Sequence, residues 1–313
     1  MINKSTRDAY GEVLLNIGRD FPNVFVMDAD LAKTTKTVYF KEKFPERFFD
    51  SGIAEQNMMG VAAGLSKTGK TVIVSTLAIF ASGRAFDQVR NTIAHSNCNV
   101  KIIATHGGIS VGRDGSSHQS IEDIALMRVI PGMKVIVPCD AVETKKSIIS
   151  SLGIQGVFYI RLGRENTPVL LRDDYEFKLG KGQILKKGKD ATLISCGMLV
   201  NEALMAAKIL ESDDIDIEVI NMSSIKPIDT ELIKESARKN KIVFTCEEHS
   251  IIGGLGSAVL ESLEEEKDIF VNRIGINDCF GESGSPKQLF EKYGLSAEKI
   301  ALRVRETISD HRK

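Results

Sequence analysis

The chain has 313 residues, of which 41 are basic, 42 are acidic and 42% are hydrophobic. A chain of this length buries a sizeable core, and a usual domain size of roughly 100 to 200 residues predicts about two domains. Because the charges nearly cancel, no overall field attracts nucleic acid or an anionic membrane, and we expect a small-molecule substrate.

The sequence shows no signal for a membrane or for export. No apolar run approaches the roughly 20 residues that cross a bilayer, and the N-terminal residues lack the basic-then-apolar pattern of a signal peptide. The five cysteines are scattered and form no CxxC pair, which is typical of a reducing compartment. We therefore expect a cytoplasmic protein without membrane contact.

The first half of the chain alternates between short β-rich runs and segments with the apolar spacing of helices. The first helix is expected from about Ser5 to Gly18, with Ser5 or Thr6 as the N-cap and Gly18 as a left-handed C-cap. Strands are expected at residues 23–29, 70–76, 99–105, 133–139 and 156–162. Continuous apolar strands between helices predict a parallel sheet that is covered on both faces.

Charged residues and glycines replace this alternation of strands and helices at residues 170–190, which predicts a domain boundary. We expect a first domain over residues 1–175, a linker over 176–190 and a second domain over 191–313. Strands of the second domain are expected at residues 190–197, 216–222, 241–248 and 268–275. The expected fold class is α/β, with two doubly wound domains.

Residues that directly follow the expected strands are candidates for a site, because open α/β sheets bind ligands beyond the carboxyl ends of their strands. Asp30 and Thr34 follow the first strand in DADLAKTT, where a solvated loop that caps a helix is the alternative. Phe80 follows the second strand, and at helical spacing it can equally be a core residue.

The third strand leads into THGGISVGRDGSSHQSIED, in which His106, Asp114 and His118 lie among glycines. Glycines let a backbone approach a ligand closely, and an imidazole can pair with a hydroxyl group or a phosphate. A metal site is one rival interpretation, but two histidines without a nearby cysteine or third histidine are not a usual ligand set. A purely structural loop is the other.

Two arginines extend this set of polar residues. Arg164 follows the fifth strand, and Arg7 lies at the head of the first helix. Arginine commonly binds phosphate through two parallel N–H groups, although most arginines in proteins are merely solvated. Together with the histidines and a hydroxyl group at Thr34, they suit a phosphorylated, hydroxyl-rich substrate.

Glu55 stands in the small and apolar run DSGIAEQNMMGVAAGL, residues 50–65. A carboxylate that faces an apolar site persists only if a partner is supplied, and a bound heterocycle can be that partner. The alternative is an acid that stabilises the N-terminus of the following helix.

The motifs GIAEQNM, GRAFDQVR, VGRDGSSHQSIEDIA and IRLGREN resemble, in order and spacing, the pyrimidine-binding domain of transketolases. In the second half, IKPID and TCEEHSIIGGLGSAV resemble the C-terminal domain of the same family, so the resemblance covers essentially the whole chain. It implies thiamine diphosphate as the cofactor and the transfer of a two-carbon glycolaldehyde unit from a ketose phosphate to an aldose phosphate.

The resemblance also implies roles for individual residues. Glu55 would hydrogen-bond the aminopyrimidine ring of the cofactor, Phe80 would stack on that ring, and Asp30 would lie near the cofactor. His118 would contact the C1 hydroxyl of the donor sugar and assist proton transfer, and Asp114 would contact a C2 hydroxyl. The sugar phosphate would be held by Arg7, Thr34, His106 and Arg164.

The chain departs from the family in one respect. Thiamine diphosphate enzymes hold the diphosphate and a divalent ion with a GDG motif followed by an asparagine, and this sequence contains no GDG. The chain therefore resembles the second half of a split transketolase and would hold no metal itself. We expect an N-terminal transketolase subunit as partner, with Mg²⁺ or Ca²⁺ bound mainly by that partner, and a self-associating α2β2 assembly.

Three alternatives stay open. The β subunit of a 2-oxo acid dehydrogenase and a deoxyxylulose-phosphate synthase fragment share the glutamate and the domain order, and a non-catalytic paralogue would keep the fold without binding a cofactor. The DGSSH stretch and the candidate phosphate ligands favour the transketolase over the first two. The joint presence of Glu55, Phe80, Asp114 and His118 argues against the third.

Overall fold

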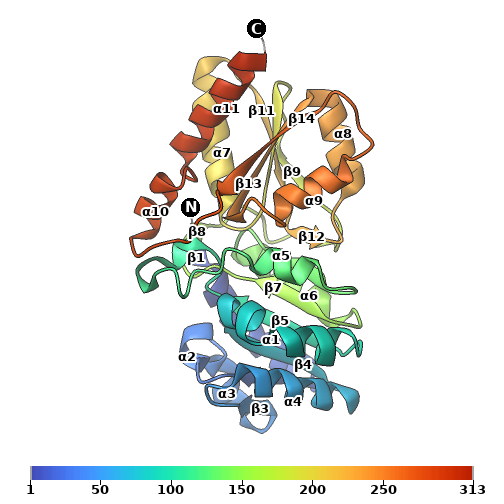
Figure 1. Ribbon diagram of the computed structural model, residues 1–313. Coiled ribbons are helices and arrows are strands. Elements are labelled where there is room, and N and C mark those ends of the chain that lie inside the picture. The colour runs from blue at the N-terminus through green and yellow to red at the C-terminus, as the bar shows by residue number, and fades with distance from the viewer. Residues whose placement is uncertain (1, 312–313) are drawn as a thin grey trace.

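A computed structural model describes residues 2–311 and shows two α/β domains, one above the other in Figure 1. The first domain is a sheet with helices on both faces. Its elements are β1 (Asn3–Ser5), α1 (Thr6–Asp20), β2 (Val24–Asp28), α2 (Ala32–Thr35), α3 (Val38–Lys43), η1 (Pro45–Arg47), β3 (Phe48–Asp50), α4 (Glu55–Lys67), β4 (Thr71–Leu77), η2 (Phe80–Arg84), η3 (Gln88–Ala94), β5 (Val100–Thr105), η4 (Ile109–Asp114), α5 (Asp123–Arg128), β6 (Lys134–Ile136), α6 (Ala141–Leu152), β7 (Phe158–Arg161) and β8 (Asn166–Pro168).

The sheet of the first domain has the strand order β12-β6-β7-β5-β4-β2-β3, in which β12 (Ser224–Lys226) comes from the second half of the chain. All neighbours are parallel except the pair of β12 and β6. The five strands that the apolar runs predict are all present. Every residue of β4 and β5 is buried, as a sheet covered on both faces requires. Along β4, Val72 and Val74 join the apolar cluster on one face, and Ile73 joins the cluster on the other.

Helix α1 begins as predicted but ends later. The hydroxyl oxygen of Ser5 caps the helix by accepting from the backbone N–H of Asp8 at 3.0 Å. The predicted C-cap at Gly18 is wrong, because the helix continues to Asp20. Gly18 instead leaves room for the ring of Phe44, since a Cβ atom there would lie 2.1 Å from Phe44 Cε2.

Two short strand pairs are not visible as apolar runs in the sequence. β3 lies at the edge of the sheet beside β2, and two of its three residues are exposed. β1 pairs with β8 in an antiparallel ribbon that places Ser5 opposite Asn166. This ribbon brings the start of α1 next to the segment that follows β7.

The second domain contains a five-stranded sheet in the order β14-β13-β10-β11-β9, in which only β9 is antiparallel to its neighbour. All four strands predicted for this half are present. The elements are β9 (Gln183–Lys186), β10 (Ala191–Ser195), α7 (Leu199–Leu210), η5 (Glu211–Asp213), β11 (Ile217–Asn221), β12 (Ser224–Lys226), α8 (Thr230–Asn240), β13 (Ile242–Ser250), α9 (Leu255–Ser262), β14 (Phe270–Ile276), α10 (Pro286–Lys292) and α11 (Ala297–His311).

The two domains share more than a connecting segment. Segment 176–190, which we expected to be a linker, holds β9, an edge strand of the second sheet. β12, which follows β11 in the second domain, pairs with β6 and so extends the first sheet. One apolar cluster also runs from Val135 in the first domain to Ile194 and Ile220 in the second. No helix in the described part of the chain is long and apolar enough to cross a membrane.

Candidate active site

Glu55 is the first residue of α4, five residues beyond the end of β3, and its side chain is only 2% exposed. Nη1 of Arg84 donates to both of its carboxylate oxygens at 2.9 Å. The position in the first turn of α4 also favours a negative charge. The buried carboxylate therefore has a cationic partner as well as a favourable helix end.

Arg84 and Phe80 are held together by a π-helical turn, η2. The backbone N–H of Ala85 donates to the carbonyl of Phe80, five residues back, at 3.1 Å. Cζ of Arg84 lies 4.2 Å from the centre of the Phe80 ring. Such turns are frequent at functional sites. The turn thus lets one guanidinium contact both the aromatic ring and the Glu55 carboxylate.

Arg84 has no role among those that the sequence predicts. A signal was available, since a buried carboxylate requires a cation or several donors, and Arg84 stands in the motif GRAFDQVR. What the sequence does not show is that a π-helical turn brings this arginine to Glu55.

His118 lies next to Phe80, with the two ring centres 5.6 Å apart and the rings edge to face. The imidazole is half-buried, and its Nδ1 lies 3.0 Å from the hydroxyl oxygen of Ser117. Contacts therefore run without a break from Glu55 through Arg84 and Phe80 to the histidine.

His106 begins the segment that follows β5, and its backbone has a positive φ of 60°. A non-glycine residue in this region is held there by its surroundings, which is common at functional sites. Burial, together with the nearby positive charges of Arg7, Arg164 and His118, lowers the pKa of His106 to about 3. At neutral pH this imidazole is uncharged, with Nδ1 at 2.9 Å from Thr105 Oγ1.

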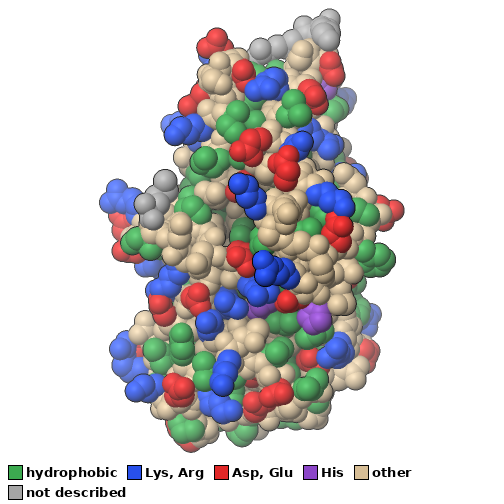
Figure 2. Space-filling model, turned by 90° about the vertical axis from the view of Figure 1, so that its left-hand side faces the viewer, with side chains coloured by type: hydrophobic (Ala, Val, Ile, Leu, Met, Phe, Trp, Pro, Cys, Tyr) green, Lys and Arg blue, Asp and Glu red, His purple; other side chains and the backbone are tan. Residues whose placement is uncertain are grey.

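Arg7 and Arg164 lie near each other because a hydrogen bond joins the chain segments that carry them. The backbone N–H of Gly163 donates to Oγ1 of Thr6 at 2.9 Å. Nη1 of Arg164 donates to Oδ2 of Asp114 at 3.0 Å, while Nε of Arg7 is buried and has no hydrogen-bond partner among the described residues. Figure 2 shows histidines beside a group of Lys and Arg side chains midway along this face of the molecule. An unpaired buried donor among positive charges suits an anionic ligand.

Asp30 precedes α2, and Thr34 lies within it. They line a surface pocket together with Lys41 and Asp50, and the backbone N–H of Asp30 donates to Asp50 Oδ1 at 3.0 Å. Asp30 also has a positive φ of 60°. Within residues 2–311, no hydrogen bond or ion pair joins either residue to Glu55 or to the histidines. The roles suggested for Asp30 and Thr34 stay predictions.

The described residues contain no group of three or more His, Cys, Asp or Glu side chains that could hold a metal ion. The arrangement of Glu55 and Phe80, by contrast, holds a planar nitrogen cation, because the guanidinium of Arg84 is hydrogen-bonded to one and stacked on the other. A protonated aminopyrimidine offers the same N–H groups and a flat π face. These two residues therefore fit the pyrimidine end of thiamine diphosphate.

The architecture is that of an α/β pyrimidine-binding domain followed by a second α/β domain. Residues 3–169 match the transketolase pyrimidine-binding domain, and residues 180–300 match the transketolase C-terminal domain. The chain belongs to the transketolase family, whose members use thiamine diphosphate.

Individual relatives agree with this assignment. The chain is 48% identical to a putative transketolase C-terminal section of Methanocaldococcus jannaschii, over 97% of this chain and 96% of that protein. It is 35% identical to the transketolase of Homo sapiens over 97% of this chain, but it spans only 49% of that enzyme. A solved structure described as a split gene transketolase, an inactive β4 tetramer, is 51% identical and superposes with a TM-score of 0.91 over 97% of this chain and 98% of that one.

Proposed function

We propose that this chain is the C-terminal subunit of a split transketolase that moves a two-carbon unit from a ketose phosphate to an aldose phosphate. The observation that carries the proposal is the unbroken series of contacts from Glu55 through Arg84 and Phe80 to His118, which ends near the positively charged Arg7 and Arg164. One end of this series fits a heterocycle and the other fits a sugar phosphate.

Glu55 and Phe80 would hold the pyrimidine of the cofactor. When bound, thiamine diphosphate supplies the carbon nucleophile and electron sink needed to break and re-form a carbon–carbon bond next to a carbonyl group. Glu55 would take up and return a proton at a pyrimidine nitrogen. Burial strengthens that hydrogen bond, since few water molecules compete for the carboxylate. Arg84, whose side chain is 47% exposed, can turn away to admit the ring.

The sugar phosphate would lie over His118 and extend toward Arg7 and Arg164. His118 would contact the C1 hydroxyl of the donor and assist proton transfer there. His106, uncharged at neutral pH, can donate or accept one hydrogen bond without adding charge. Asp114, held by Arg164, would bind a C2 hydroxyl.

We also propose an obligate partner that carries the GDG domain and binds Mg²⁺ or Ca²⁺ with the diphosphate. The chain spans about half the length of the human transketolase, and one relative is described as a C-terminal section and another as split. An α2β2 assembly with the cofactor between subunits would bring Glu55 to the diphosphate site. Asp30 and Thr34, which line their own pocket, would contribute to the cofactor and phosphate sites only in that assembly.

The test is isothermal titration of thiamine diphosphate with magnesium, first into this chain alone and then into its co-expressed complex with the candidate partner. We expect binding only in the complex, followed by ketose-to-aldose transfer in a coupled assay. Tight, metal-dependent binding by the chain alone would refute the split site. A complex that instead oxidised 2-oxo acids with a lipoyl acceptor would point to the dehydrogenase alternative.

A further inference from the structure

The segment between β5 and α5, residues 106–121, carries His106, Asp114 and His118, and we call it the histidine loop. It has little regular structure of its own beyond the 3₁₀ segment η4. Its backbone therefore depends on neighbouring elements to hold the three side chains in place. Several of these neighbours belong to the second domain.

Glu248, near the end of β13, supports the beginning of the histidine loop. The residue is only 3% exposed, and its Oε1 accepts a hydrogen bond from the backbone N–H of Ser110. Gly108 leaves room for the carboxylate, since a Cβ atom there would lie 2.3 Å from Glu248 Cδ. The glycine also has a positive φ of 85°. The loop is therefore shaped to receive this one carboxylate.

The far end of the histidine loop is attached to the same strand. The guanidinium of Arg161 donates to the carbonyls of Ser120 at 3.1 Å and of Glu248 at 2.9 Å. The backbone N–H of Ser250 donates to the carbonyl of Ile121 at 2.7 Å. Both ends of the loop thus rest on the last residues of β13.

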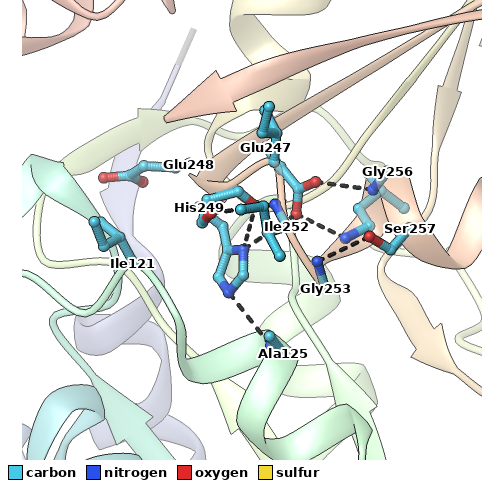
Figure 3. A network of polar contacts seen from close by, with 12 residues as sticks. Ile121, Ala125, Glu247, Glu248, His249, Ile252, Gly253, Gly256 and Ser257 are labelled. Atoms are coloured by element: carbon cyan, nitrogen blue, oxygen red, sulfur yellow. Dashed lines mark hydrogen bonds and ion pairs between the residues drawn. The ribbon is translucent and has the colours of Figure 1, made fainter. Parts of the chain in front are cut away.

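The adjacent residue Glu247 provides a natural contrast. Its carboxylate accepts from the backbone N–H groups of Leu255 at 2.7 Å and Gly256 at 2.8 Å, at the start of α9. Figure 3 shows the two glutamates pointing in opposite directions from β13, with Glu247 toward α9 and Glu248 toward the first domain. The Glu247 carboxylate binds the start of α9 within the second domain, whereas the Glu248 carboxylate binds the histidine loop of the candidate active site.

We propose that Glu248 is a positioning residue, which places Asp114 and His118 by fixing the backbone of the histidine loop through Ser110 and Gly108. Its role in substrate binding rests on the proposed transketolase function. A buried backbone donor that loses its acceptor has no water to replace it, so the loop moves to find another partner. Small displacements of positioning groups are costly for a reaction that depends on orientation.

The first test is hydrogen exchange of the full chain, read by mass spectrometry, for Glu248→Ala, Glu248→Gln and the matched control Glu247→Gln. Glu248→Ala should speed amide exchange in the histidine loop roughly tenfold or more, because the Ser110 N–H loses its acceptor. Glu248→Gln keeps an oxygen acceptor and should stay near the parent. Glu247→Gln should affect α9 and leave the loop unchanged.

The second test is kinetic and uses the complex with the partner subunit. Glu248→Ala should raise KM for the sugar phosphates by about tenfold, with the Kd of thiamine diphosphate unchanged within about twofold. Glu248→Gln should restore the parental KM. A residue that served only the fold would lower thermal stability and leave KM unaltered, as we expect for Glu247→Gln.

Three outcomes would overturn the proposal: unchanged loop exchange in Glu248→Ala, an unchanged KM in that variant, or equal impairment in Glu248→Gln. If Glu248→Ala does not fold, Glu248→Asp replaces it, because the shorter side chain keeps the charge but withdraws the oxygens from Ser110. If the parent complex lacks transketolase activity, the proposed function fails, while loop exchange still decides the positioning role.

Discussion

The two sheets have the same mainly parallel build but use the carboxyl ends of their strands differently. Beyond the strands of the first sheet stand Glu55, Phe80, His106 and Arg164, which are grouped at one site. The strands of the second sheet instead end against the first domain. Glu248 reaches Ser110, and Gly197, just after β10, donates its backbone N–H to the carbonyl of Val137 at 3.1 Å.

The clearest case in the second sheet is the end of β11. Nδ2 of Asn221 donates to both carboxylate oxygens of Glu143 at 3.0 Å, and Glu143 also accepts from Ser223 at 2.7 Å and Tyr175 at 2.9 Å. Glu143 belongs to α6 and is fully buried. The polar groups at this edge therefore bind another part of the same chain.

The difference teaches that polar groups at strand ends mark a surface with binding capacity and do not by themselves show what is bound. In the first domain the buried Nε of Arg7 is unpaired among the described residues, whereas in the second domain the carboxylates of Glu247 and Glu248 have partners within the chain. Substitutions at the first edge should therefore cost activity. Those at the second should cost stability, except at Glu248, whose carboxylate holds the histidine loop of the first domain.

The largest effect is expected for Glu55→Gln. In the partner complex it should lower kcat by roughly 10²- to 10⁴-fold, because an amide cannot exchange a proton with the pyrimidine nitrogen. The urea midpoint should change little, and the exposed Glu46→Gln serves as the control. A loss of less than about tenfold would remove Glu55 from the catalytic role.

A smaller effect, and one on stability, is expected for Glu143→Ala. The free energy of unfolding should fall by about 2 to 4 kcal/mol, since the side chains of Asn221, Ser223 and Tyr175 lose a buried acceptor. Urea denaturation of the chain measures this. The exposed Glu264→Ala should stay within about 0.5 kcal/mol of the parent. An equally small change in Glu143→Ala would mean that the second edge does not hold the domains together.

The smallest effect concerns pH. The pKa of His106 is lowered to about 3, below the ordinary value of about 6.5, so between these values the unfolded chain binds a proton that the folded chain does not. Stability should therefore fall as pH decreases from about 6.5 toward 3. His106→Asn removes this contribution, and its urea midpoint should fall less steeply over the same range. Parallel curves for parent and variant would show that His106 does not titrate in this way.

The sequence predicts nine strands, five in the first half and four in the second, because apolar residues dominate each of these runs. It does not reveal β3 or β9, which are partly exposed, nor β12, which has only three residues. It also misplaces the end of α1. A glycine is needed at position 18 because the ring of Phe44 packs against it, and not because the helix ends there. Long-range packing, invisible in a local pattern, accounts for this error.

The sequence predicts only some of the residues that the structure groups at the candidate active site. The rule about strand ends brings His106, Asp114, His118 and Arg164 into consideration, and the head of the first helix adds Arg7. The structure places these five residues together. The same rule also brings in Asp30 and Thr34, which have no hydrogen bond or ion pair with Glu55 or with the histidines within residues 2–311. It also passes over Arg84 and Glu248, because their relevance depends on a π-helical turn and on contact between domains.

The pairing of β12 with β6 has a consequence for how the gene can be divided. A break in the chain between residues 169 and 183 would separate the two strands and leave β6 as an open edge with unpaired N–H and C=O groups. Such an edge invites aggregation. A protein engineer who wished to recombine transketolase modules should therefore exchange both domains as a single cassette.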